Sequence, residues 1–123
     1  MIIVMKPEAT TAELDAVKNK VIKYAKQKKV REPIICYNYI TASIKEDRLP
    51  LREEIDEWLP GRDVVFLSAD GHSSSYSTSM LKLMGLYEEE HNGILVGEDH
   101  EFNMGRLVEI VMKHINASMF IKG

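Results

Sequence analysis

The sequence contains a single cysteine, Cys36, so no disulfide can form within the chain. One thiol and no disulfide are typical of proteins from a reducing compartment, and we expect a cytoplasmic location. The sequence also lacks any apolar run near the roughly 18 residues that a membrane-spanning helix needs. Its first residues have neither the charged start nor the apolar stretch of a signal peptide. We therefore expect no membrane segment.

The sequence has no strong excess of charge of one sign. Its 16 Lys and Arg residues against 19 Asp and Glu residues give a formal net charge of −3. Basic residues cluster from Lys18 to Arg31, but acidic residues flank them, and a lysine-rich helix face is usually only solvated. We expect no nucleic-acid partner. With no repeat, low-complexity tract or linker, residues 1–123 should form one domain that buries about two-thirds of its unfolded surface.

Short β-branched runs alternate with segments whose apolar residues recur at helical spacing. The runs predict strands at 2–5, 33–40, 64–67 and 94–96, with a further edge strand at 117–121. The helices should begin at Thr10 or Thr11, in the turn at Pro50, at Ser77 or Thr78, and at Asn103. This alternation predicts an α/β fold, with a small, at least partly parallel or mixed sheet of about four or five strands and helices packed against it.

The segment 64–86 carries the most informative pattern, since an apolar strand is followed by a turn signal and then a capped helix. α/β proteins usually bind ligands just beyond the carboxyl end of a strand, where Asp70, Gly71 and His72 stand. His72 would donate to a substrate oxygen, and Asp70 would fix its tautomer. The alternative is structural: Asp70 forms an Asx turn and His72 bonds to the backbone.

Two further patterns have a chemical and a structural interpretation. The run 73–75 (SSS) precedes the predicted helix, where hydroxyls and free N–H groups either hold an anion or simply cap the helix. Residues 71–75 also approximate the Gly-x-Ser-x-Gly nucleophile elbow, although the fifth residue is not glycine. A second group of acidic and histidine residues either binds a metal ion, with His72 joining it in space, or forms a solvated charged loop. The group comprises His91, Glu98, Asp99, His100 and Glu101.

Three stretches occur together in a recognisable order. They are 49–59 (LPLREEIDEWL), 60–73 (PGRDVVFLSADGHS) with the helix 78–86 (TSMLKLMGL), and 92–98 (NGILVGE). In order and spacing they resemble an internal segment of the metal-dependent amidohydrolases related to N-substituted formamide deformylase. The resemblance covers roughly residues 11–112. One departure is 77–79 (STS), where the family usually has Asn-Ser.

The resemblance implies a parent enzyme in which a metal activates water to attack an amide or related non-peptide C–N bond. Such enzymes are (β/α) barrels with a small β domain, and a barrel alone needs about 250 residues. The family's His-x-His pair and its later Lys, His and Asp ligands have no counterpart here. The chain is thus expected to be a substrate-side insert without a complete catalytic site or cofactor of its own, the divalent metal belonging to the full-length parent.

The resemblance also implies which residues would face a small-molecule substrate in the full enzyme. They are Asp70, Gly71, His72 and Ser73 at the turn, Tyr37 and Tyr39, predicted to share one face of the neighbouring strand, and Glu98 from the later loop. The alternative function is an independent binding or interaction module without enzymatic activity. Either way, we expect a homo-oligomer, because a free insert would expose the apolar surface that a barrel normally covers.

Overall fold

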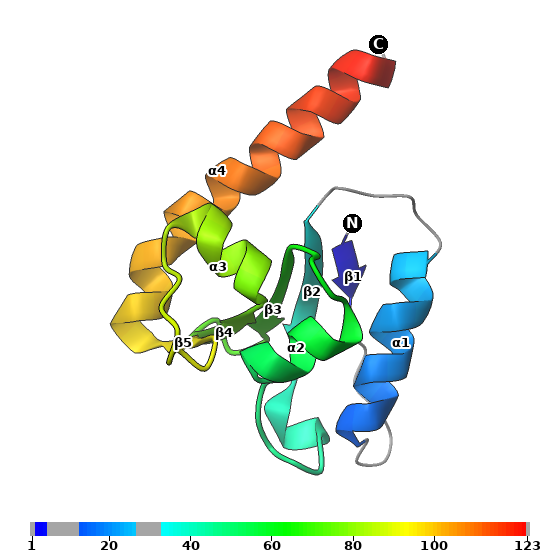
Figure 1. Ribbon diagram of the computed structural model, residues 1–123, viewed down its shortest axis with the longest axis vertical. Coiled ribbons are helices and arrows are strands. Elements are labelled where there is room, and N and C mark those ends of the chain that lie inside the picture. The colour runs from blue at the N-terminus through cyan, green and yellow to red at the C-terminus, as the bar shows by residue number, and fades with distance from the viewer. Residues whose placement is uncertain (1, 5–12, 27–32, 123) are drawn as a thin grey trace.

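The computed structural model describes residues 2–4, 13–26 and 33–122. Its elements, in chain order, are β1 (Ile2–Val4), α1 (Leu14–Lys26), β2 (Ile34–Tyr39), η1 (Thr41–Ser43), α2 (Arg52–Trp58), β3 (Val64–Ser68), β4 (Ser73–Tyr76), α3 (Thr78–Met84), β5 (Ile94–Val96) and α4 (Gly97–Lys122). The predicted α/β class is confirmed (Figure 1). The predicted caps at Thr10 and Thr11 lie outside the described residues. Within the described ranges, no helix has the length and apolar character that crossing a membrane requires.

The sheet is mixed and has five strands in the order β1-β2-β3-β4-β5. β1, β2 and β3 are parallel neighbours, joined by connections that contain α1 and α2. β4 is antiparallel to β3, and β5 is antiparallel to β4. The predicted partly parallel sheet is therefore confirmed, with a parallel part at the N-terminal side and an antiparallel part at the C-terminal side.

Two apolar clusters cover the two faces of the sheet. Successive strand residues point to opposite faces, and accordingly Val64 and Phe66 of β3 belong to one cluster while Val65 belongs to the other. The first cluster receives Val17, Val21 and Ala25 from α1 and Ile55 from α2. The second receives Met80, Leu81 and Met84 from α3 and Leu107 from α4. Each face of the sheet thus has its own pair of helices.

A bulge in β2 reverses the predicted direction of Tyr39. Cys36 pairs with Phe66 but Tyr39 pairs with Ser68, so β2 uses one residue more than β3 over this interval. Asn38, inside the bulge, has φ of +65°, a conformation in which Asn is enriched. Tyr37 is consequently 55% exposed while Tyr39 is 1% exposed in the first cluster. The prediction that both tyrosines share a face was wrong because strict alternation does not survive a bulge.

The serine run 73–75 forms part of strand β4, which was not predicted, and the predicted helix α3 begins two residues after that strand ends. Ser74 pairs with Leu67 of β3 and with Leu95 of β5, so two flanking strands hold the segment extended. The predicted boundaries of α3 are confirmed. Ser77 Oγ accepts from Met80 N at 3.2 Å and caps α3, and Gly85, at φ of +74°, ends it.

The last helix is longer than predicted. It begins at Gly97, whose φ of +58° turns the chain directly from β5 into α4, and it continues to Lys122. The predicted charged loop at 97–101 is therefore the first turn of α4, where Glu98 and Asp99 favourably face the helix dipole. The helix neither begins at Asn103 nor gives way to an edge strand at 117–121. Figure 1 shows its C-terminal part extending away from the sheet.

Candidate functional site at the turn between β3 and β4

The turn after β3 is built by Asp70 and Gly71. Asp70 Oδ1 accepts a hydrogen bond from His72 N at 2.8 Å, and Gly71 N donates to Ser68 O at 3.1 Å. The bond from His72 N is the main reason why the pKa of Asp70 lies below its usual value. Gly71 has φ of +76°, which side chains with a Cβ rarely adopt. The Asx-turn interpretation of Asp70 is thus the one observed, so its carboxylate orients the backbone.

His72 projects from this turn towards the first turn of α4. Its side chain is 72% exposed, and its Nδ1 lies 3.9 Å from Glu101 Oε1, within ion-pair range when the imidazole is protonated. A backbone hydrogen bond holds the same two segments together, because Gly97 N donates to His72 O at 2.9 Å. The structure therefore joins the two segments that the sequence suggested could meet, and Glu101 is the member of the acidic and histidine group that lies beside the His72 side chain.

A buried polar chain lies beneath this surface and was not predicted. Ser74 Oγ lies 2.8 Å from Tyr76 Oη and 2.8 Å from His100 Nδ1, and all three residues are buried. The tautomer of His100 decides which of Ser74 Oγ and His100 Nδ1 donates in their hydrogen bond. Burial raises the pKa of Tyr76, although the bond from Ser74 opposes this rise. The hydrogen bonds among Tyr76, Ser74 and His100 therefore link α4 to β4 beneath the turn.

The serines do not form a nucleophile elbow. An elbow needs a sharp turn from strand to helix with an exposed hydroxyl, whereas Ser73 begins strand β4 and Ser74 and Ser75 are fully buried. Ser75 Oγ is buried without a hydrogen-bond partner in the part of the chain that the structure describes. Two of the three serines are therefore interior residues, and the third is half-buried in the sheet.

The five acidic and histidine residues that suggested a metal site are not gathered into one ligand set. No three His, Cys, Asp or Glu residues among the described ones could together hold a metal ion. His91 Nδ1 instead accepts from Gly93 N at 2.8 Å in the turn before β5, and His100 is buried against Ser74. Glu98 is exposed on the first turn of α4.

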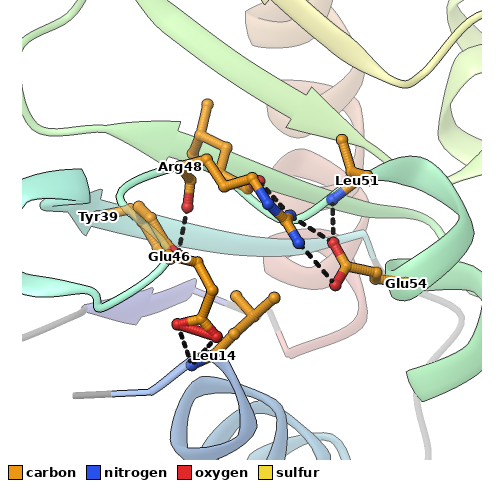
Figure 2. A network of polar contacts seen from close by, with 7 residues as sticks. Leu14, Tyr39, Glu46, Arg48, Leu51 and Glu54 are labelled. Carbon is orange, nitrogen blue, oxygen red and sulfur yellow. Dashed lines mark hydrogen bonds and ion pairs between the residues drawn. The ribbon is translucent and has the colours of Figure 1, made fainter.

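Tyr39 touches the turn only through its backbone, since Ala69 N donates to Tyr39 O at 2.8 Å. Its side chain points into the first cluster, where Tyr39 Oη donates to Arg48 O at 2.9 Å (Figure 2). Burial is the main cause of a raised pKa for this hydroxyl. Of the two tyrosines, only Tyr37 remains exposed.

Charged side chains also gather after β2 (Figure 2). Arg48 forms a bidentate ion pair with Glu54, and Glu54 Oε1 also accepts a hydrogen bond from Leu51 N at 2.8 Å at the start of α2. Burial would raise the pKa of Glu54, but the bonds from Arg48 and Leu51 outweigh it and hold that pKa below its usual value. Both oxygens of Glu46 accept from Leu14 N at 3.1 Å, at the start of α1. The starts of two helices, where α/β proteins often bind anions, are thus occupied by carboxylates of the chain itself.

No family model and no curated protein matches this chain. Two solved structures do. An uncharacterized metal-dependent hydrolase from Pyrococcus furiosus matches with a TM-score of 0.65 and 17% identity over 88% of this chain. An uncharacterized metal-dependent hydrolase from Pyrococcus horikoshii OT3 matches with a TM-score of 0.60 and 15% identity over 93% of this chain. The match covers 21% of each of those proteins. The chain therefore has the fold of a segment that is about one fifth of a larger hydrolase.

Proposed function

We propose that this chain is the substrate-side insert segment of a metal-dependent hydrolase that cleaves non-peptide C–N bonds, without a complete catalytic site of its own. The observation that carries the proposal is the asymmetry of the structural match. Nearly the whole of this chain corresponds to 21% of each Pyrococcus hydrolase. The amidohydrolase-like order of the stretches 49–59, 60–73 and 92–98 supports the same assignment.

The turn from Asp70 to Ser73 is the part of the segment that we assign to the mouth of the substrate pocket. The Asp70–His72 part of the turn is exposed, but its backbone is fixed by two hydrogen bonds, from His72 N to Asp70 Oδ1 and from Gly97 N to His72 O. An imidazole on a backbone fixed in this way is able to donate a hydrogen bond to a substrate oxygen. Tyr37 and Glu98, both exposed, are weaker candidates for the same surface.

The divalent metal that this function requires would be bound by the remainder of the hydrolase, since the described residues offer no three-residue ligand set. Its chemistry would be the activation of water. The part played by this segment is to orient a small-molecule substrate and to close the site. The single cysteine, which favours a reducing compartment, supports a cytoplasmic enzyme.

A chimaera tests the proposal. The matched segment of the Pyrococcus furiosus hydrolase is replaced by this chain, and metal content is measured together with hydrolysis of a panel of N-formyl and N-acyl compounds. We expect metal content to be retained and the preference among substrates to change. His72→Ala in the chimaera should lower kcat/KM at least about tenfold, the effect of losing one hydrogen bond of roughly 1.4 kcal/mol.

The matched control is Glu88→Ala, which removes an exposed charge from the loop after α3. It should change neither metal content nor kcat/KM. If the chimaera folds, binds metal and hydrolyses its substrates while His72→Ala has no more effect than Glu88→Ala, the turn does not contact substrate and the assignment fails.

The second candidate function is an independent binding or interaction module, favoured by the exposed apolar residues of α4, such as Phe102. Genomic context separates the two. A coding sequence that continues on either side into barrel strands with a His-x-His pair supports the insert. A promoter and a stop codon that bracket residues 1–123 support the module.

A further inference from the structure

Helix α4 carries an apolar stripe that no other described part of the chain covers. Phe102 is 86% exposed, Val108 is 51% exposed and Met112 is 47% exposed. Gly105 lies between them, and a Cβ at this position would meet nothing within 4 Å. Steps of three and four residues place these four positions along one side of the helix.

The opposite side of α4 is already used. Leu107 is buried against the second cluster, and Met104, Ile110 and Val111 pack against that cluster with partial burial. The stripe therefore faces away from the sheet, on a helix that Figure 1 shows projecting from the rest of the molecule. A second helix has room to lie against it, and Gly105 at its centre permits a close approach.

The charges at the two ends of the stripe indicate what kind of helix fits. Exposed Glu98, Asp99 and Glu101 stand just before Phe102. At the other end, exposed Lys113 stands just after Met112, and exposed Glu109 lies one turn before Lys113 on the side of the stripe. A second copy of α4 laid antiparallel would bring its Lys113 to this acidic turn and its own acidic turn to Lys113 of the first copy. A parallel copy would place like charges together. The antiparallel arrangement also opposes the two helix dipoles favourably.

We propose that two copies of this chain associate through α4, antiparallel and about a twofold axis, with the stripe Phe102–Gly105–Val108–Met112 at the centre of the interface. Such an interface is self-complementary, because each copy contributes the same surface. Burial of the apolar residues provides the free energy of association, and the opposite charges that meet at the two ends select the antiparallel direction. The proposal goes beyond the hydrolase function and does not depend on it, since it concerns the chain by itself.

Sedimentation and light scattering of the purified chain across a wide concentration range test the interface. We expect a monomer–dimer equilibrium that Met112→Glu and Phe102→Ser each weaken on the order of 30-fold, as truncation of a central interface residue does. The control is Leu83→Ser, which removes an apolar side chain that is 49% exposed on α3. Circular dichroism should show folded chains throughout. A chain that stays monomeric at every concentration overturns the proposal, as does a dimer that the stripe variants leave unchanged.

A charge exchange tests the direction. Lys113→Glu and Glu98→Lys should each weaken the dimer, because each variant places like charges opposite one another twice. Mixing the two variants should restore association, since the heterodimer has an opposite-charge contact at both ends. Glu88→Lys, which makes the same change of charge away from α4, should weaken nothing. If the mixture associates no better than its components, the antiparallel pairing is wrong.

Discussion

The parallel and antiparallel parts of the sheet use polar residues in opposite ways. In the parallel part, beside β2, the partly exposed Arg48 and Glu54 form an ion pair. Around β4 and β5, polar groups such as Ser75 and His100 are buried, whereas an apolar side chain such as Phe102 is exposed. From this comparison we expect the parallel part to be self-contained and the antiparallel part to be the one that contacts a partner.

The largest effect should come from truncating the core of the parallel part. Phe66 is fully buried, and its ring makes edge-on contacts with the rings of Tyr39 at 5.8 Å and Trp58 at 6.3 Å. We expect Phe66→Ala to lower the free energy of unfolding by about 3–5 kcal/mol in urea denaturation. Leu83→Ala, on the exposed side of α3, should cost within about 0.5 kcal/mol. Similar losses for the two variants would contradict a self-contained parallel core.

Within β4, two neighbouring serines should respond differently to the same change. Ser74→Ala removes the partner of both Tyr76 and His100 and should cost about 2–3 kcal/mol, because a buried group left without its bond is destabilising. Ser75→Ala removes a hydroxyl that makes no hydrogen bond within the described chain, so it should be neutral or stabilising by about 0.5 kcal/mol. Thermal unfolding of both variants would show the contrast. Equal destabilisation would mean that Ser75 has a partner.

At the turn that joins the two parts, Gly71→Val should cost about 1–3 kcal/mol, because its φ of +76° strains a β-branched residue. Gly71→Asn should cost clearly less, since Asn tolerates this conformation and a Cβ here would meet nothing within 4 Å. Urea unfolding of the pair distinguishes backbone strain from crowding. If Asn costs as much as Val, the backbone conformation is not the reason for glycine.

The smallest effect should depend on pH. The folded state holds the pKa of Glu54 below its usual value, so this carboxylate stabilises the fold above the ordinary glutamate pKa of about 4.3 and loses that contribution as pH falls through its folded value. Glu54→Gln should therefore cost roughly 1–2 kcal/mol at pH 7. The difference from the unchanged chain should shrink on acidification below pH 4. A difference that persists in acid would assign the effect to packing.

The sequence is informative about the parallel part because its strands are covered on both faces. Val64 to Leu67 and Ile34 to Cys36 are apolar whichever way each residue points, and both stretches were predicted to lie in strands. β4 was missed because Ser-Ser-Ser-Tyr has little strand propensity of its own. Its extended form comes from pairing with β3 and β5, which the local sequence does not encode.

The candidate site, like the fold, was only partly predictable from the sequence. Asp-Gly marks a turn through local chemistry, and the turn at Asp70 and Gly71 is present. The approach of Glu101 to His72 depends on α4 beginning at Gly97, and a polar stretch after a glycine gives no sign of a helix start. The burial of Tyr39 depends on the bulge at Asn38, which period-two alternation cannot reveal.

Cys36 gives the molecule a built-in reporter of breathing motions. It lies in the middle of the parallel sheet with no exposed surface, and burial is the chief cause of a thiol pKa raised far above its usual value. Since the thiolate is the reactive form, alkylation must await an opening that admits both water and reagent. As this is the only thiol in the chain, the rate of its labelling measures how often β2 separates from its neighbours, without any introduced probe.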